Sequence, residues 1–208
     1  MKVLNLYAGI GGNRKLWNGV DVTAVEIEPK IAKIYQDFFP NDKVVIGDAH
    51  QYLLEHYDDG WDFIWSSPPC PTHSRARYWA SKGNKFSPLY PDMKLYQEII
   101  FLTNYAKCKW VVENVIGYYI PLIKPKEIHR HYFWSNFILN EKLFKSINTG
   151  FNQGDIYRWS EYHNFDISQY KIESYDKRQI LRNCVFPELG KFVFDCAFKL
   201  QQKKIMEG

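Results

Sequence analysis

The sequence predicts an α/β fold built on a mostly parallel sheet with helices on both faces. Three apolar, strand-like runs near the N-terminus lead to this prediction: Lys2–Tyr7, Val22–Val25 and Lys43–Ile46. Glycine or an acidic residue follows each run within two positions. Rossmann-like folds bind ligands at the carboxyl ends of parallel strands, where such residues would gather. The 208 residues suffice for one domain with a sizeable core.

The first run leads into a glycine-rich turn, Ala8–Gly12. The segment Asn13–Trp17 is then expected to begin a helix, with Asn13 as its N-cap. Strand, glycine turn and helix are typical of nucleotide-type cofactor sites, because glycines let the backbone approach a ligand closely. The spacing lacks the full dinucleotide fingerprint, so an ordinary strand-to-helix turn is the alternative.

Acidic residues follow the second and third runs. Glu26 stands where a Rossmann-like unit places a carboxylate that accepts hydrogen bonds from a ribose. Asp48 is a candidate acceptor for an adenine amino group. The alternative for either carboxylate is a favourable negative charge at a helix N-terminus.

A proline-rich turn, Ser66–Pro71, follows the apolar run Trp61–Trp65 and contains Cys70. Proline fixes φ and removes a backbone donor, so the turn is stiff and holds the thiol at the end of a strand. This position suits a nucleophile, and positive charge from Arg75, Arg77 or Arg130 would favour its thiolate form. An unreactive buried cysteine is the alternative. A further strand-like run, Lys109–Val112, ends at Glu113, which is either a catalytic carboxylate or a strand-end carboxylate that faces solvent.

The segment 72–85 interleaves basic and aromatic residues. Such a loop can bind phosphates and stack on bases, and Gly83 would give it mobility. A solvated surface loop is the alternative. The residues concerned are Arg75, Arg77, Tyr78, Trp79, Lys82 and Lys85.

Composition narrows the class of protein. The formal net charge is only +4, so any basic surface must be local. No apolar run is long enough to span a membrane, and no secretory segment is evident. The four cysteines lack C-x-x-C spacing, which argues against a zinc site or a disulfide framework and favours a reducing cytoplasm.

The order of these motifs resembles that of the DNA cytosine-5 methyltransferases, which use S-adenosylmethionine. The resemblance covers nearly the whole chain, and the ordered combination of Pro-Pro-Cys with Glu-Asn-Val is its most specific part. The matching segments, in chain order, are Leu4–Gly12, Glu26, Gly47–Asp48, Pro69–Cys70, Glu113–Val115 and Arg178–Pro187.

The resemblance implies a Rossmann-like S-adenosylmethionine-dependent methyltransferase fold, double-stranded DNA as the partner and no metal. It implies methyl transfer to C5 of a flipped-out cytosine through a covalent Cys70 adduct. The implied catalytic residues are Cys70, Glu113, Asn114 and Arg130. The implied cofactor-binding residues are Tyr7, Ala8, Gly9, Gly11, Gly12, Glu26, Ile27, Asp48, Ala49, Pro69, Asn183, Cys184 and Val185. The implied nucleic-acid-binding residues are Ser74, Arg75, Arg77, Lys82, His129 and His131.

Several positions depart from the pattern of the family. Asn5 and Tyr7 stand where Asp and Phe are usual, and both changes keep the shape of the side chain. Arg182 replaces a glycine before Asn183, and Pro71 replaces a common glutamine. The family's basic motif has two arginines that flank one residue, and the corresponding segment here is His129-Arg130-His131.

The motif positions divide the chain into a catalytic and cofactor-binding core (1–139), a reduced target-recognition lobe (140–176) and a segment that returns to the core (177–208). Within this division a loop then a helix is expected over 88–106, a strand over 132–139, and a strand or helix over 192–200. The short recognition lobe suggests low sequence specificity or a separate specificity partner, and the small size suits a bacterial or phage methyltransferase. Two rival functions stay open: a tRNA cytosine-5 methyltransferase, and a catalytically inactive nucleic-acid-binding regulator of the same fold.

Overall fold

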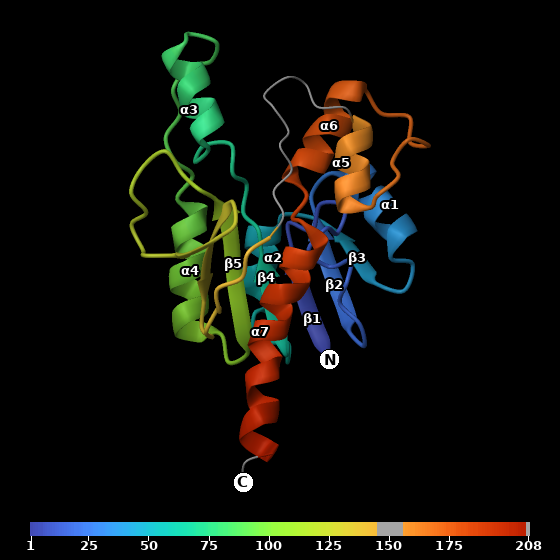
Figure 1. The fold of residues 1–208 in the computed structure, drawn as a ribbon, viewed down its shortest axis with the longest axis vertical. Coiled ribbons are helices and arrows are strands. Elements are labelled where there is room, and N and C mark those ends of the chain that lie inside the picture. Colours follow the sequence, from blue (N-terminus) through green and yellow to red (C-terminus); the bar gives the residue numbers. More distant parts are fainter. Residues whose placement is uncertain (145–155, 207–208) are drawn as a thin grey trace.

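A seven-stranded sheet runs through the centre of the computed structural model, which describes residues 1–144 and 156–206 (Figure 1). The strand order is β3-β2-β1-β4-β5-β7-β6. Strand β7 runs antiparallel to both of its neighbours, and the other pairs are parallel. The strands are β1 (Lys2–Leu6), β2 (Asp21–Glu26), β3 (Lys43–Ile46), β4 (Phe63–Ser66), β5 (Lys109–Val115), β6 (Lys126–Ile128) and β7 (His131–Ser135). The helices are α1 (Pro29–Phe38), α2 (Ala49–His56), α3 (Arg75–Lys82), α4 (Lys94–Tyr105), α5 (Ile156–His163), α6 (Ser174–Asn183) and α7 (Pro187–Met206).

Helices cover both faces of the sheet, as predicted. Successive side chains of a strand point to opposite faces. On one face Leu4 and Leu6 of β1 belong to the same apolar cluster as the buried residues of α2 and α4. On the other face Val3 packs in a cluster with α7, and Ala24 of β2 packs against Tyr35 of α1. The mostly parallel α/β fold predicted from the sequence is therefore confirmed.

The segment Asn13–Trp17 forms turns, so the prediction of a helix there is wrong. An N-cap side chain must accept a backbone hydrogen bond. The Asn13 amide instead donates to Asn5 Oδ1 at 2.7 Å, which holds it against the sheet. Trp17 stacks on Phe194 of α7, with ring centroids 5.0 Å apart. Helix α7 thus supplies the packing that a helix after the glycine turn would have supplied.

The other expected elements are placed more closely. The segment 88–106 is a loop followed by α4. The strand expected at 132–139 is β7, which begins at His131 and ends at Ser135, four residues earlier than expected. Residues 192–200 lie within α7, so the helical alternative is correct. The expected loop 72–85 contains a helix, α3, which projects beyond the end of the sheet (Figure 1). Part of the predicted recognition lobe, residues 145–155, lies outside the described residues. Within the described residues, none of the helices combines the length and apolar character needed to cross a membrane.

Candidate active site

Cys70 lies in the turn that follows β4, at the carboxyl edge of the sheet. Its backbone carbonyl accepts hydrogen bonds from the amides of His73 and Ser74, at 3.0 and 3.1 Å, so the turn leads directly into α3. Burial, together with the negative charge of Glu113, raises the pKa of the Cys70 thiol to about 11. The thiol is therefore protonated at neutral pH in this conformation, and catalysis would require that it be activated.

The cation that acts on Cys70 is Arg182 of α6. Its positive charge lowers the pKa of the thiol, against the larger effect of burial. The sequence prediction named Arg75, Arg77 or Arg130 for this part. The Nε atom of Arg75 instead donates to the Gly117 carbonyl at 3.0 Å, because α3 leads the chain away from the turn. The departure from the family's glycine at position 182 thus places a charge near the candidate nucleophile.

Glu113 is buried on β5 and is held by two side chains. Its Oε2 atom accepts a hydrogen bond from Ser67 Oγ at 2.8 Å, and Trp65 Nε1 donates to the same hydroxyl at 2.8 Å. Its Oε1 atom lies 2.6 Å from Nδ1 of His131. Strand β7 pairs with β5 beside this position, so the sheet itself brings His131 to the carboxyl group.

The neighbouring Asn114 is also buried, and it bonds to the nucleophile turn. Its Nδ2 atom donates to the Pro68 carbonyl at 2.9 Å, and its Oδ1 atom accepts from the Val115 amide at 3.0 Å. The end of β5 is thereby tied to the turn after β4. Cys70, Glu113 and Asn114 therefore meet at one edge of the sheet.

The basic motif between β6 and β7 separates into residues with different surroundings. His131 contacts Glu113. His129 has a φ of 57°, and its ring faces Phe144 at a centroid distance of 5.9 Å. Arg130 is exposed, and no hydrogen bond joins it to Cys70 or Glu113 within the described chain. The structure therefore brings His131, rather than Arg130, to the predicted catalytic residues.

The glycine turn after β1 passes over the end of the sheet in a left-handed backbone conformation. Tyr7, Gly9 and Gly11 have φ values of 55°, 54° and 85°. The Gly9 amide donates to Glu26 Oε2 at 2.9 Å, and the Glu28 amide donates to Glu26 Oε1 at 3.0 Å. Both carboxylate oxygens are thus fixed by the backbone, and each keeps a lone pair for a ligand.

The C-terminal motif closes against this turn. A Cβ atom at Gly12 would lie 2.2 Å from Cys184 Sγ and 2.3 Å from the Val185 carbonyl oxygen, so only glycine fits. Burial raises the pKa of the Cys184 thiol to about 12, which is the behaviour of a packed structural cysteine. Asn183 ends α6 and is exposed, and its Oδ1 atom accepts a hydrogen bond from Gln179 at 2.8 Å. The first and last predicted cofactor motifs are therefore in contact.

Asp48 caps α2, which is the alternative that the sequence left open. Its Oδ1 atom accepts hydrogen bonds from the amides of His50 and Gln51, at 2.8 and 3.4 Å. Its Oδ2 atom lies 3.5 Å from Lys94 Nζ. Ala49 is the first residue of the helix and is buried. The carboxylate is nearly half exposed, so capping leaves part of it accessible.

Glu98 of α4 is a buried carboxylate that the sequence analysis missed. It is 1% exposed, and it contacts Tyr7 Oη and Ser66 Oγ at 2.5 Å each and His50 Nδ1 at 2.9 Å. The hydrogen bond between His50 and the Glu98 carboxylate is the main cause that raises the pKa of His50. A signal was present, because Leu95, Ile99 and Leu102 surround position 98 at helical spacing. The network joins the glycine turn, the end of β4 and α2.

The residues at the glycine turn fit S-adenosylmethionine. A Cβ atom at Gly9 would meet no atom within 4 Å, so the backbone borders open space there. The apolar side chain of Ile27, directly after Glu26, is 66% exposed. An exposed apolar side chain beside a fixed carboxylate suits a nucleoside, with its base on Ile27 and its ribose at Glu26. Among the described residues, no cluster of three or more His, Cys, Asp or Glu side chains is placed to hold a metal ion.

Solved structures with a similar arrangement include several methyltransferases. One is a putative DNA modification methyltransferase encoded within a prophage of E. coli, with 23% identity and a TM-score of 0.36 over 56% of this chain and 32% of that one. Another is the S. pombe Dnmt2 methyltransferase, with 21% identity and a TM-score of 0.41 over 55% of this chain and 34% of that one. This chain thus spans about a third of the length of either structure.

A comparison of sequences gives the assignment. No curated protein matches the chain. The sequence model of the C-5 cytosine-specific DNA methylases matches residues 1–121, which is more than half of the chain. This match includes the glycine turn, Glu26, Asp48, Cys70 and Glu113. The chain therefore belongs to the C-5 cytosine-specific DNA methylase family.

Proposed function

We propose that this protein methylates C5 of cytosine in DNA, with S-adenosylmethionine as the methyl donor and Cys70 as a covalent nucleophile. The observation that carries the proposal is that the turn holding Cys70 is bonded to the end of β5, through Ser67 to Glu113 and through Pro68 to Asn114, at the carboxyl edge of the sheet. The glycine turn and Glu26 lie along the same edge. A nucleophile, an acid and a cofactor cradle are the parts that this reaction requires.

Cytosine C5 is a poor nucleophile, so the ring must first be activated. The Cys70 thiolate adds to C6, which forms an S–C6 bond and makes C5 an enamine-like carbon. S-adenosylmethionine, when bound, supplies the electrophilic methyl group that C5 takes up. A base then removes the C5 proton, the S–C6 bond breaks, and the thiolate of Cys70 is regenerated. The buried thiol must lose its proton before this cycle starts, and Arg182 favours that loss.

Glu113 acts at cytosine N3 while Cys70 adds to the ring. It donates a proton or a hydrogen bond there, which stabilises the charge that moves onto the ring. His131 is 2.6 Å from its other oxygen and serves to orient the carboxyl group. Asn114 holds the nucleophile turn through Pro68 and takes no part in proton transfer. Arg130 is exposed, so its proposed part is contact with the substrate.

The cofactor site that we propose follows the edge of β1, β2 and β3. Glu26 would bind the ribose of the cofactor. The adenine would be bound by Ile27, Asp48 and Ala49. The turn Tyr7–Gly12 would bind the remainder of the cofactor. Asn183, Cys184 and Val185 would close the site from the other side, with Pro69 between cofactor and target base.

The nucleic-acid surface that we propose lies over α3 and the β6–β7 turn. A base inside a duplex cannot reach Cys70, so the target must flip out at a cost of a few kcal/mol. Phosphate contacts would come from Ser74, Arg75, Arg77, Lys82 and His129, whereas His131, which the sequence also assigned to nucleic-acid binding, is engaged with Glu113. Recognition of sequence is assigned to residues 140–176, between the core (1–139) and the returning segment (177–208), with or without a separate specificity partner.

The test is transfer of radiolabelled methyl groups from S-adenosylmethionine to unmethylated duplex DNA and, in parallel, to bulk tRNA. We expect label in DNA that is absent with Cys70→Ala. Label in tRNA alone would reject DNA as the substrate and move the protein to the RNA branch of the family. No label in either nucleic acid, together with measurable cofactor binding, would favour the inactive regulator.

A further inference from the structure

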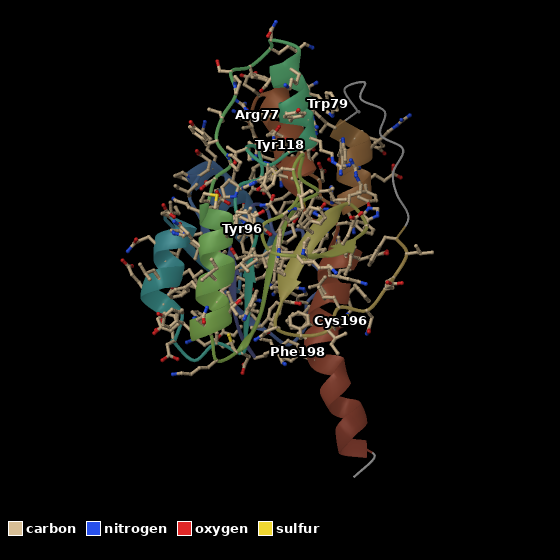
Figure 2. All side chains as sticks on the ribbon, turned by 90° about the vertical axis from the view of Figure 1, so that its left-hand side faces the viewer. Arg77, Trp79, Tyr96, Tyr118, Cys196 and Phe198 are labelled. Atoms are coloured by element: carbon tan, nitrogen blue, oxygen red, sulfur yellow. The ribbon has the colours of Figure 1, made fainter. Side chains whose placement is uncertain are left out.

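Residues 72–91 form an arm that stands away from the body of the molecule (Figure 1 and Figure 2). All eight residues of α3, the helix of the arm, are described, and none of them is buried. Between Phe63 and Pro91 the sequence holds four Lys or Arg residues and no acidic residue. The arm is therefore a uniformly basic projection beside the candidate active site.

A pocket of about 220 Å³ opens between the arm and Tyr118. Tyr78 and Tyr118 form an aromatic wall, and their rings stack 4.6 Å apart with 5° between the planes. Leu89 adds apolar surface, and Arg77 and Lys82 add positive charge. Figure 2 shows Arg77 and Tyr118 together at the lower part of α3.

Hydrogen bonds at the base of the arm fix this pocket relative to Cys70. The Tyr118 amide donates to the His73 carbonyl at 3.1 Å, and Arg75 Nε donates to the Gly117 carbonyl at 3.0 Å. Pro71, the residue directly after Cys70, also lines the pocket. A ligand in the pocket would therefore lie beside the nucleophile turn.

The lining selects a flat ring that carries an anionic group. Aromatic side chains stack on nucleobases, and neighbouring cations bind the attached phosphate. The Nε atom of Arg77 is buried and donates to no residue in the described part of the chain, which leaves a donor for a ligand. The pocket is smaller than the roughly 300 Å³ of the smallest sites for drug-sized ligands, so it suits one ring system.

We propose that this pocket receives a second unstacked nucleobase, from the nucleotide next to the target cytosine in the same DNA strand. The base would stack on the outer face of the Tyr78–Tyr118 pair, and Arg77 and Lys82 would bind its phosphate. The proposal rests on the proposed function, because the target base must occupy the site at Cys70. It gives the protein a specificity contact outside residues 140–176.

The test measures binding of a DNA duplex that carries one unpaired 2-aminopurine, against the same duplex with an abasic residue at that position. Fluorescence anisotropy gives the affinity, and quenching of 2-aminopurine reports stacking. We expect the unpaired base to tighten binding by about 5-fold to 150-fold, the range of stacking on an aromatic side chain. Tyr118→Ala should remove this preference, and Tyr118→Phe should keep it.

The control variant is Tyr90→Ala, because Tyr90 is 96% exposed on the arm and does not line the pocket. Leu89→Trp, which fills the pocket from an exposed position, should remove the preference even if Tyr118→Ala fails to fold. Equal affinity for the two duplexes in the unmodified protein would overturn the proposal. A second result would also overturn it: the preference for the unpaired base is lost in Glu113→Gln and kept in Leu89→Trp. The unpaired base would then occupy the candidate active site and not the pocket. These assays measure DNA binding and not methyl transfer. A protein that failed to methylate DNA would therefore still show whether the pocket takes an unpaired base.

Discussion

The hydrogen bond between Tyr7 and the buried Glu98 can be removed by one substitution, Tyr7→Phe, which introduces the residue that is usual in the family. Glu98 is 1% exposed, and the Tyr7 hydroxyl contacts it at 2.5 Å. A hydrogen bond to a charged group contributes about 1.5–3 kcal/mol. We expect the free energy of unfolding to fall by that amount, because Ser66 and His50 are already bonded to the carboxylate and cannot replace the lost donor.

The substitution should also weaken the cofactor site. Tyr7 has a φ of 55°, a left-handed conformation that costs a residue with a side chain about 1–2 kcal/mol. The bond to Glu98 helps to hold Tyr7 in this conformation, so its loss should let the glycine turn relax. Affinity for S-adenosylhomocysteine should therefore decrease together with stability.

Urea unfolding and titration calorimetry measure the two effects. Tyr105→Phe, on the exposed face of α4, is the matched control and should stay within about 0.5 kcal/mol of the unmodified protein. The double variant Tyr7→Phe/Glu98→Gln should lose less stability than the sum of the single variants, because the two residues share one bond. A Tyr7→Phe protein as stable as the control would refute the reasoning.

Four further outcomes are expected. Cys70→Ser should abolish methyl transfer and leave cofactor affinity unchanged in calorimetry, whereas comparable turnover would exclude the covalent mechanism. Arg182→Ala should slow alkylation of Cys70 by iodoacetamide at pH 8, because loss of the positive charge raises the pKa of the thiol; an equal or faster rate would contradict this. Gly12→Ala should lower the free energy of unfolding by about 1–3 kcal/mol in urea, because the new Cβ atom would lie 2.3 Å from a backbone oxygen, and an unchanged midpoint would count against this packing. Glu98 raises the pKa of His50 in the folded protein. The contribution of this pair to the free energy of unfolding should therefore be present below the ordinary histidine pKa of about 6.5 and be lost as pH rises through the raised value. The His50→Gln protein should show no such loss of stability with pH.

The sequence was sufficient for the order of elements at the catalytic edge. The runs that end in Gly47-Asp48, Ser66 and Glu113 are the strands β3, β4 and β5. Strand β3 pairs with β2, β4 with β1 and β5 with β4, all in parallel, as the βα pattern requires. Local chemistry decides these elements, because buried apolar runs and turn residues act over a few positions. The resemblance also assigned the glycine turn and Cys184 to one cofactor site, and the structure packs them together.

Contacts between distant segments decided what the sequence could not show. Asn13 has a good N-cap side chain, yet a bond to Asn5 turns it toward the sheet. The choice of His131 over Arg130 as the partner of Glu113 depends on the pairing of β5 with β7, which periodicity does not give. The cation near Cys70 comes from α6, more than a hundred residues away along the chain.

The contact between Trp17 and α7 has a consequence for how the protein folds. The indole Nε1 atom of Trp17 donates to the Gly190 carbonyl at 3.2 Å, across 173 positions of the chain. Contacts of such sequence separation slow folding, because the intervening chain must be ordered before they form. On the ribosome, the glycine turn would stay without this cover until residues 187–198 had emerged. The contact between Trp17 and α7 can therefore form only late in synthesis.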